Sequence, residues 1–366
     1  MTKAAELAKM GEVITNSQIG GRRNIVYNGA MQVAQRSVSV TGIGASAGYF
    51  TLDRFRISPA STAGRLTMTQ TADGPSGFAN CLKLDCTTAD ASIAAGERLI
   101  LQHKIEGQDL QQLKKGTSDA EEFTVSFYVK GNASATYVVE IFDLDNTRQI
   151  SKTFSVTTGW TRVILTFPAD TTGALGDDNA ASLQIGIWLH AGSTYTSGTL
   201  NSSAFGDGNT SANRAVGISS FFDSTDRTFF LTGLQMELGS QATPFEHRSF
   251  GEELALAQRY FEKSYAQGTA PATATSASGI QYRFGNSATT AANYGQSQTR
   301  FGVYKRAAPT VVIYSTAGTS AHVTAEGGAS GDKNVEVTHS GEGGFSINTT
   351  EVTDQNTFHF TADTEL

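Results

Sequence analysis

The chain has 366 residues, 17% of them charged against about 25% in an average soluble domain. Its formal charge is −7 and its basic residues form only short clusters, which argues against nucleic acid as a partner, because phosphate binding needs clustered Lys and Arg. No apolar run approaches the roughly 20 residues of a membrane-spanning helix, so no membrane insertion is expected.

The composition favours an all-β chain. Serine and threonine together account for 80 of the 366 residues (46 Thr and 34 Ser), and glycine contributes 38 more. The 21 Phe, 11 Tyr and 2 Trp are enough to build cores, while 6 Pro argue against a polyproline chain. This mixture is typical of short strands joined by turns, and the length suggests two or three folding units.

Residues 1–23 are expected to attach the chain to a larger assembly. Leu7, Met10 and Ile14 have helix-compatible spacing, and a Gly-Gly break and the pair Arg22 and Arg23 follow them. The segment is too short and too polar to bury itself, and its arginines can dock against an acidic neighbour. A frayed terminus is the alternative interpretation.

Residues 24–248 carry a series of strand patterns. Within 123–130 the side chains of Phe123, Val125, Phe127 and Val129 share one face of a strand. Eight or more short strands with turn residues between them predict a jelly-roll β-sandwich. The expected strands cover 65–70, 81–85, 98–102, 123–130, 137–142, 160–167, 183–189 and 228–236, and a short helical turn is expected within 109–115.

A helix and a smaller β domain are expected after the sandwich. Ser249 and Glu252 fit a capping box, and the apolar residues that follow predict a helix over 252–265. This helix and the small-residue stretch after it form a connecting segment, 249–278. Residues 279–366 then form a small C-terminal β domain, with strands expected at 280–284, 301–304, 310–315, 335–338 and 357–361.

The sequence lacks catalytic, cofactor and metal motifs. None of its six histidines pairs with another at metal-ligand spacing, there is no nucleophile-elbow motif, and its adjacent acidic pairs point apart. We therefore expect no catalytic residue, no cofactor and no metal ligand. The stretches 143–146 and 206–209 have oxygen side chains that suit either calcium or simple turns.

Several tyrosines are candidates for stacking on a sugar. Tyr195 lies in a long polar loop, 190–214, and Tyr282, Tyr294 and Tyr304 lie in the Gly-, Ser- and Thr-rich C-terminal domain, whose turns offer neutral hydrogen-bonding groups. The alternative is that these rings fill a core. For the two tryptophans, Trp160 and Trp188, core packing is the favoured interpretation.

Several phrases of the sequence resemble the tail-fibre-like structural proteins of tailed bacteriophages, of the marine or cyanophage type. They cover 23–36 (RNIVYNGAMQVAQR), 49–55 (YFTLDRF), 231–239 (LTGLQMELG), 242–249 (ATPFEHRS), 252–260, 301–310 (FGVYKRAAPT) and 360–366 (FTADTEL). The resemblance implies a virion component whose central domain is similar to carbohydrate-binding jelly rolls. These phrases carry no ligand residues of the family, so they leave the binding specificity open.

The leading hypothesis is a non-enzymatic tail fibre or fibre-like appendage of a virion that is assembled in the host cytoplasm. Its N-terminus would bind other virion proteins, and the chain would contact host cell-surface glycans as a homotrimer, since a symmetric partner buries more apolar surface than one small sandwich can. A capsid fibre, a decoration protein or a tail-adaptor subunit is the first alternative. A polysaccharide-degrading tail spike is the second.

Overall fold

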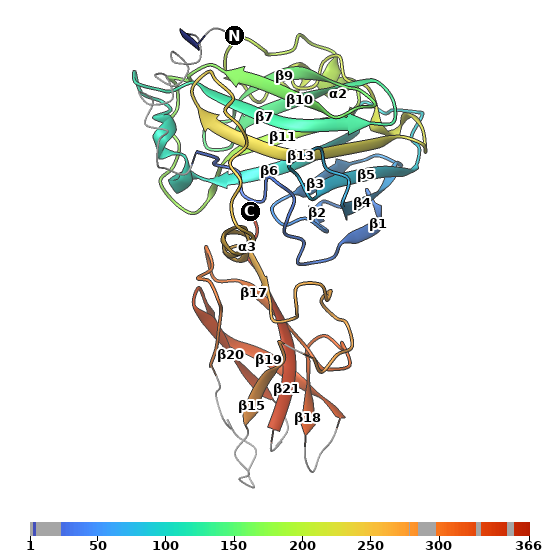
Figure 1. The fold of residues 1–366 in the computed structure, drawn as a ribbon, viewed down its shortest axis with the longest axis vertical. Coiled ribbons are helices and arrows are strands. Elements are labelled where there is room, and N and C mark those ends of the chain that lie inside the picture. Colours follow the sequence, from blue (N-terminus) through green and yellow to red (C-terminus); the bar gives the residue numbers. More distant parts are fainter. Residues whose placement is uncertain (1–2, 5–22, 278, 285–297, 327–330, 350–354) are drawn as a thin grey trace. The chain divides into compact units, whose positions relative to one another are not determined.

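The computed structural model describes residues 3–4, 23–277, 279–284, 298–326, 331–349 and 355–366, and it is mainly β. The chain divides into two compact units (Figure 1). Unit 1 comprises Met1–Gln32, Ser39–Phe50 and Phe55–Arg248, and unit 2 comprises Val33–Val38, Thr51–Arg54 and Ser249–Leu366. The attachment residues Leu7, Met10, Ile14 and Arg22 lie outside the described residues; the backbone amide of Arg23 donates to Glu246 in unit 1.

Unit 1 is a β-sandwich of two antiparallel sheets. Sheet A has the order β1 (Ser39–Ile43), β4 (Arg65–Thr71), β5 (Cys81–Thr88), β13 (Thr228–Leu238), β7 (Phe123–Gly131) and β10 (Thr161–Phe167). Sheet B has the order β12 (Gly206–Asp207), β9 (Arg148–Val156), β8 (Ala135–Asp143), β11 (Ala181–Ala191), β6 (Arg98–Glu106), β3 (Arg56–Ala60) and β2 (Gly48–Tyr49).

Alternating side chains build the core between the two sheets. In β7 the predicted face of Phe123, Val125, Phe127 and Val129 is buried, and the residues between them point to the other side. Rings from opposite sheets meet in this core, as Phe127 of β7 lies 5.1 Å from Phe154 of β9. The two inner faces therefore interdigitate as in other β-sandwiches.

The outer face of sheet B is covered by the long loop after β11. The loop contains the helical turns α2 (Ser193–Thr196) and η3 (Ser211–Asn213). Tyr195 packs at 5.1 Å from the ring of Trp188, and Ile100, Val138 and Ala215 complete a second small core. The expected core packing of Trp188 is confirmed, since this side chain is fully buried.

Only one half of the outer face of sheet A is covered by other parts of the chain. The segment after β13 folds back over this face. Glu237 of β13 accepts hydrogen bonds from the backbone amide and the hydroxyl of Thr243 in that segment, at 2.9 and 2.6 Å. Side chains of this half, such as Thr124 and Gln235, are buried as a result. The other half of the face is the part of sheet A that remains accessible to solvent.

Unit 2 contains one eight-stranded antiparallel sheet. Its main path is β14 (Phe261–Lys263), β21 (Gln355–Asp363), β18 (His322–Glu326), β19 (Gly331–Gly341), β20 (Gly344–Thr349) and β16 (Gln298–Arg300), and β15 (Gln281–Phe284) and β17 (Thr310–Tyr314) also pair with β21. Its core includes Ile313, Val323, Phe345, Phe358 and Phe360.

The connecting helix is shorter than predicted. Helix α3 (Phe250–Gln258) begins with the expected capping box between Ser249 and Glu252. The predicted extension to residue 265 is wrong, because Phe261–Lys263 pairs with β21 as strand β14. Strand pairing here outweighs the helical spacing of the apolar residues, and the hydrogen-bonded ladder satisfies the same backbone groups.

The remaining predicted elements fall close to the observed strands, with two kinds of error. The strand expected at 301–304 is absent from the described structure, where these residues form a bend. Besides β14, the strands β1, β2, β3, β9, β12, β16, β18 and β20 were not predicted. The helical turn expected within 109–115 is observed as two 3-10 turns, Gly107–Asp109 and Gln111–Leu113. In the described part of the chain, no helix has the length and apolar character needed to span a bilayer.

Candidate functional site

A row of side chains crosses the accessible half of the outer face of sheet A. Cross-strand pairing places its first five members side by side, because each is the partner of the next in the antiparallel register, and Trp160 follows as the residue before Thr161, the partner of Val129. The row begins on β1 and ends just before β10, and it consists of Ser39, Thr69, Lys83, Phe230, Lys130 and Trp160. Five strand spacings give it a length of about 24 Å. We call this set the open row.

Two aromatic rings form the apolar part of the open row. Phe230 lies between the core residues Phe229 and Leu231 in β13, so its side chain points to the outer face. Trp160 precedes β10, and its ring centroid is 6.2 Å from that of Phe230 in an edge-to-face arrangement. Both rings are half-buried, which leaves part of each open to a ligand.

Lysines and carboxylates surround these rings. The Lys130 ammonium lies 4.6 Å from the ring centroid of Phe230 and 5.2 Å from that of Trp160, within the range of cation–π attraction. Its Nζ is also 2.7 Å from Asp73, and Lys83 is 2.8 Å from Asp85. Each lysine of the row is therefore matched by a carboxylate, and the row with these two acids is close to neutral.

A second aromatic group lies next to the open row. Tyr128 of β7 also points outward, and its ring centroid is 5.3 Å from that of Phe78. Phe78 in turn contacts Phe245 and His247, at 5.0 and 5.1 Å between centroids. Gly233 makes this packing possible, because it has φ of 64° and a Cβ at that position would lie 2.8 Å from the Phe78 ring.

The role predicted for Trp160 as a core residue is wrong. Single-strand alternation could not assign its face, because Trp160 precedes β10 and its neighbour Thr161 is exposed. The available signal was the pairing of β10 with β7, in which Thr161 is the partner of Val129. That register places Trp160 beside the outward-pointing Lys130 and shows that it belongs to the outer face.

The tyrosines proposed as glycan contacts occupy different environments. Tyr195 is 9% exposed and its hydroxyl accepts from Arg98, which does not agree with the expected open ring. Tyr282 and Tyr304 are exposed in unit 2, at 54% and 74%. Tyr294 lies outside the described residues.

Tyr304 lines an open pocket in unit 2 with a volume of about 460 Å³. Arg300, Phe301, His339 and Ser340 also line it, together with backbone of Gly341, Gly343 and Gly344. The pocket combines one exposed ring with polar groups, so it is a second surface on which a sugar could stack. Beside the exposed ring of Tyr304, the half-buried ring of Phe301 also lines this pocket.

The two stretches considered for calcium are held as turns. Asp143 accepts the backbone amides of Asp145 and Asn146, both at 3.0 Å, and forms an ion pair with the buried ammonium of Lys115. Asp207 accepts the backbone amide of Asn209 at 2.8 Å. These are the side-chain-to-backbone bonds that Asp makes in turns for local reasons.

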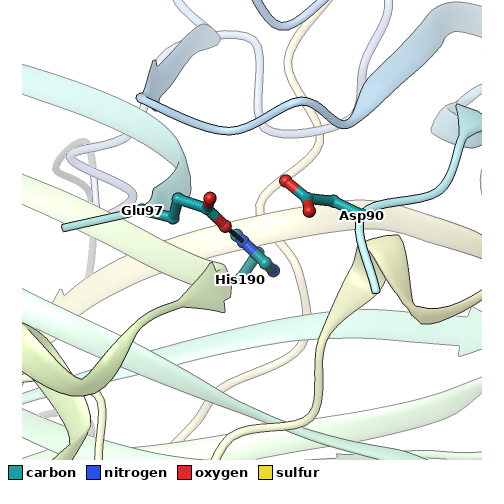
Figure 2. Close-up of side chains that lie close together, drawn as sticks. All are labelled: Asp90, Glu97 and His190. Carbon is teal, nitrogen blue, oxygen red and sulfur yellow. Dashed lines mark hydrogen bonds and ion pairs between the residues drawn. The ribbon is translucent and has the colours of Figure 1, made fainter. Parts of the chain in front are cut away.

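Three residues with metal-binding side chains meet elsewhere in unit 1. Asp90 follows β5, Glu97 precedes β6, and His190 lies near the end of β11. Figure 2 shows the two carboxylates and the imidazole directed toward one another, with one donor atom of each within 4.8 Å of the others. All three residues are buried. The three positions form no local spacing motif, so the sequence alone did not predict this cluster.

No protein-family model matches the sequence, and no curated protein matches it significantly. Among solved structures, the chain is similar to a CBM4 carbohydrate-binding module, with 11% identity, a TM-score of 0.31, and coverage of 58% of this chain and 99% of that one.

Two further structures illustrate the range of similar folds. Tailspike protein 4 of bacteriophage CBA120, in its enzymatically active domain, has 13% identity and a TM-score of 0.30, over 59% of this chain and 21% of that one. The CBM22-1 and GH10 modules of the Clostridium thermocellum xylanase 10B, complexed with xylohexaose, have 12% identity and a TM-score of 0.30, over 60% and 29%. At TM-scores below 0.5 these similarities carry no argument about the ligand or assembly of this chain.

Proposed function

We propose that the chain is a non-enzymatic glycan-binding protein and that the open row of unit 1 holds the glycan. The observation that carries the proposal is the pair of half-open rings, Trp160 and Phe230, within a line of hydroxyl and charged groups that crosses five strands of sheet A and ends just before β10. Sugar rings combine apolar faces with hydroxyl edges, and such a line offers partners for both.

The charge of the site favours a neutral glycan. Lys83 and Lys130 each contact an acidic side chain, so the row has little net charge to offer an anionic polymer. The same pairing argues against catalysis at this face, because Asp73 and Asp85 each form an ion pair with a lysine. A linear neutral oligosaccharide of several sugars matches the length of the row.

Affinity electrophoresis tests the proposal. The full chain is run through native gels that contain xylan, laminarin, galactomannan or alginate. We expect retardation by at least one of the three neutral polysaccharides and weaker retardation by alginate. If none of the three neutral polysaccharides retards the protein, or if alginate retards it most, the proposal fails.

Three variants locate the binding surface. Trp160→Ala should weaken binding at least tenfold, about 1.4 kcal/mol or more, as expected for a central aromatic anchor. The control, Ile164→Ala, removes another exposed apolar side chain from the same outer face but outside the row, and it should bind normally. Loss of binding in Tyr304→Ala with normal binding in Trp160→Ala would move the site to the unit 2 pocket.

The biological setting of the proposal comes from the sequence resemblance. We propose a virion fibre or fibre-like appendage, with residues 1–23 bound to other virion proteins and the glycan on the host surface. Antibody labelling of intact particles tests this location. Label on appendage tips supports it, label on the head or near the portal supports a capsid fibre, decoration or adaptor subunit, and label confined to host cytoplasm refutes both.

Two further properties can be tested on the purified chain. We propose a homotrimer, so light scattering should give about three times the 38.7 kDa chain mass, and a monomer mass would refute it. Incubation with any glycan that binds should release no new reducing ends. Release of reducing ends would instead support the alternative of a polysaccharide-degrading spike.

A further inference from the structure

The cluster of Asp90, Glu97 and His190 concentrates negative charge inside unit 1. The exposed fractions of these residues are 7%, 5% and 0%. Within the described ranges, no lysine or arginine nitrogen lies within 4.0 Å of either carboxylate, and His190 is the basic side chain that contacts Glu97. Buried carboxylates are normally paired with a cation or bound to a metal, so this site lacks a full positive partner among the described side chains.

The imidazole of His190 is oriented as in metal sites. Its Nδ1 is 2.8 Å from the hydroxyl of Ser220, and its Nε2 is 3.2 Å from Oε2 of Glu97. Ser220 Oγ also accepts the backbone amide of Phe222 and can accept Nδ1–H with its second lone pair. On binding a metal, Nε2 would lose the proton that it shares with Glu97 and Nδ1–H would donate to Ser220, the arrangement in which an outer hydrogen bond fixes a ligating histidine.

Asp90 is also held by outer contacts. One of its oxygens, Oδ2, accepts the hydroxyl of Thr62 at 2.7 Å and the backbone amide of Ala63 at 2.8 Å. Two donors outside the cluster therefore hold this oxygen of Asp90 in place.

We propose that Asp90, Glu97 and His190 bind one divalent transition-metal cation of the zinc class. One nitrogen and two carboxylate oxygens suit Zn²⁺, Mn²⁺ or Co²⁺, whereas Ca²⁺ and Mg²⁺ prefer all-oxygen sites. In a tetrahedral zinc site with bonds near 2.1 Å, donor atoms are about 3.4 Å apart. The donor atoms of His190 and Glu97 are 3.2 Å apart, close to that spacing, and one oxygen of Asp90 lies within 4.8 Å of both.

The proposed ion has a structural role in the sandwich. Asp90 and Glu97 are the two ends of the loop 91–96, which joins β5 of sheet A to β6 of sheet B and whose residues are all exposed. His190 belongs to β11, the neighbour of β6 in sheet B. One ion bound by all three would tie both ends of the exposed loop to the core.

Metal titration of the full chain tests the proposal. The protein is stripped with chelator, dialysed and titrated with ZnCl₂, CaCl₂ or MgCl₂ by calorimetry. We expect one Zn²⁺ per chain and no comparable binding of Ca²⁺ or Mg²⁺. Saturating Zn²⁺ should raise the melting temperature of unit 1, followed by tryptophan fluorescence, by about 5 °C or more. Wild-type protein that binds no stoichiometric Zn²⁺, or binds it without this rise, overturns the proposal.

Variants separate this cluster from surface histidines. Glu97→Gln and His190→Gln should each lower Zn²⁺ affinity at least tenfold and abolish the thermal shift. The control, His247→Gln, removes an exposed histidine of unit 1 and should bind as wild type. If His190→Gln does not fold, Glu97→Gln decides, because it keeps an oxygen acceptor beside His190. Undiminished binding in Glu97→Gln, or loss of binding in His247→Gln, overturns the proposal.

Discussion

Replacing Arg214 by alanine should destabilise unit 1 by about 3–5 kcal/mol, because it leaves a buried carboxylate without its cation. Glu140 of β8 is fully buried. Arg214 Nε donates to its Oε1 at 2.6 Å and Arg214 Nη2 donates to its Oε2 at 2.8 Å, while Trp188 Nε1 donates to Oε2 at 3.0 Å. In Arg214→Ala, the indole of Trp188 would be the only one of these three hydrogen-bond donors left to Glu140.

The expected loss is a large share of domain stability, which is typically about 5–15 kcal/mol. The double variant Glu140→Leu/Arg214→Met removes both charges and fills similar volume. Since an apolar replacement of a buried ion pair is often close to neutral, the double variant should be more stable than Arg214→Ala. The single variants Glu140→Leu and Arg214→Met, together with this double variant, give the coupling energy between the two side chains.

Urea unfolding followed by tryptophan fluorescence measures these changes in unit 1 alone. The chain has two tryptophans, and both Trp160 and Trp188 belong to unit 1. Trp188 also contacts the ion pair directly, so its signal reports the affected region. A loss of less than about 1 kcal/mol in Arg214→Ala would refute the reasoning, and so would a double variant less stable than the single one.

Two further predictions concern packing and pH. Gly29→Ala should destabilise unit 1 by more than about 2 kcal/mol, because the new Cβ would lie 2.1 Å from the Leu234 carbonyl oxygen. In the control Gly159→Ala, the new Cβ meets no atom within 4 Å. Equal urea midpoints for the two variants would contradict this prediction. Burial lowers the pKa of His359, whose ring stacks on Tyr265 at 4.0 Å. Below about pH 6.5 the unfolded state therefore takes up a proton that the folded state resists, so unit 2 should lose stability as the pH falls from 7.5 to 5. Circular dichroism melts of wild type and His359→Gln measure the loss, which the variant should reduce; equal slopes in both proteins would count against it.

Local patterns in the sequence determined the β class and much of the strand layout. The alternation of Phe123, Val125, Phe127 and Val129 is enough to predict a strand with one buried face, because side chains in a strand alternate with a period of two. The capping box of Ser249 and Glu252 likewise marks the start of α3, since its hydrogen bonds are made within four residues.

The end of α3 was decided by tertiary structure. The apolar spacing in this segment is that of a helix up to Phe261 and beyond, yet Phe261–Lys263 forms a ladder with Thr361–Asp363. The partner strand lies about a hundred residues later in the chain. A pattern within one segment contains no information about such a partner, so the helix was predicted too long.

The candidate sites depend on the same kind of long-range pairing. Trp160 and Phe230 become neighbours because β10 and β13 both pair with β7, and the face of Trp160 follows from that register. Asp90 and His190 are a hundred residues apart in the chain and meet because β11 pairs with β6, which follows the loop of Asp90. Sequence periodicity reports that a strand has two faces, whereas only the assembled sheets decide which face is covered and which side chains share it.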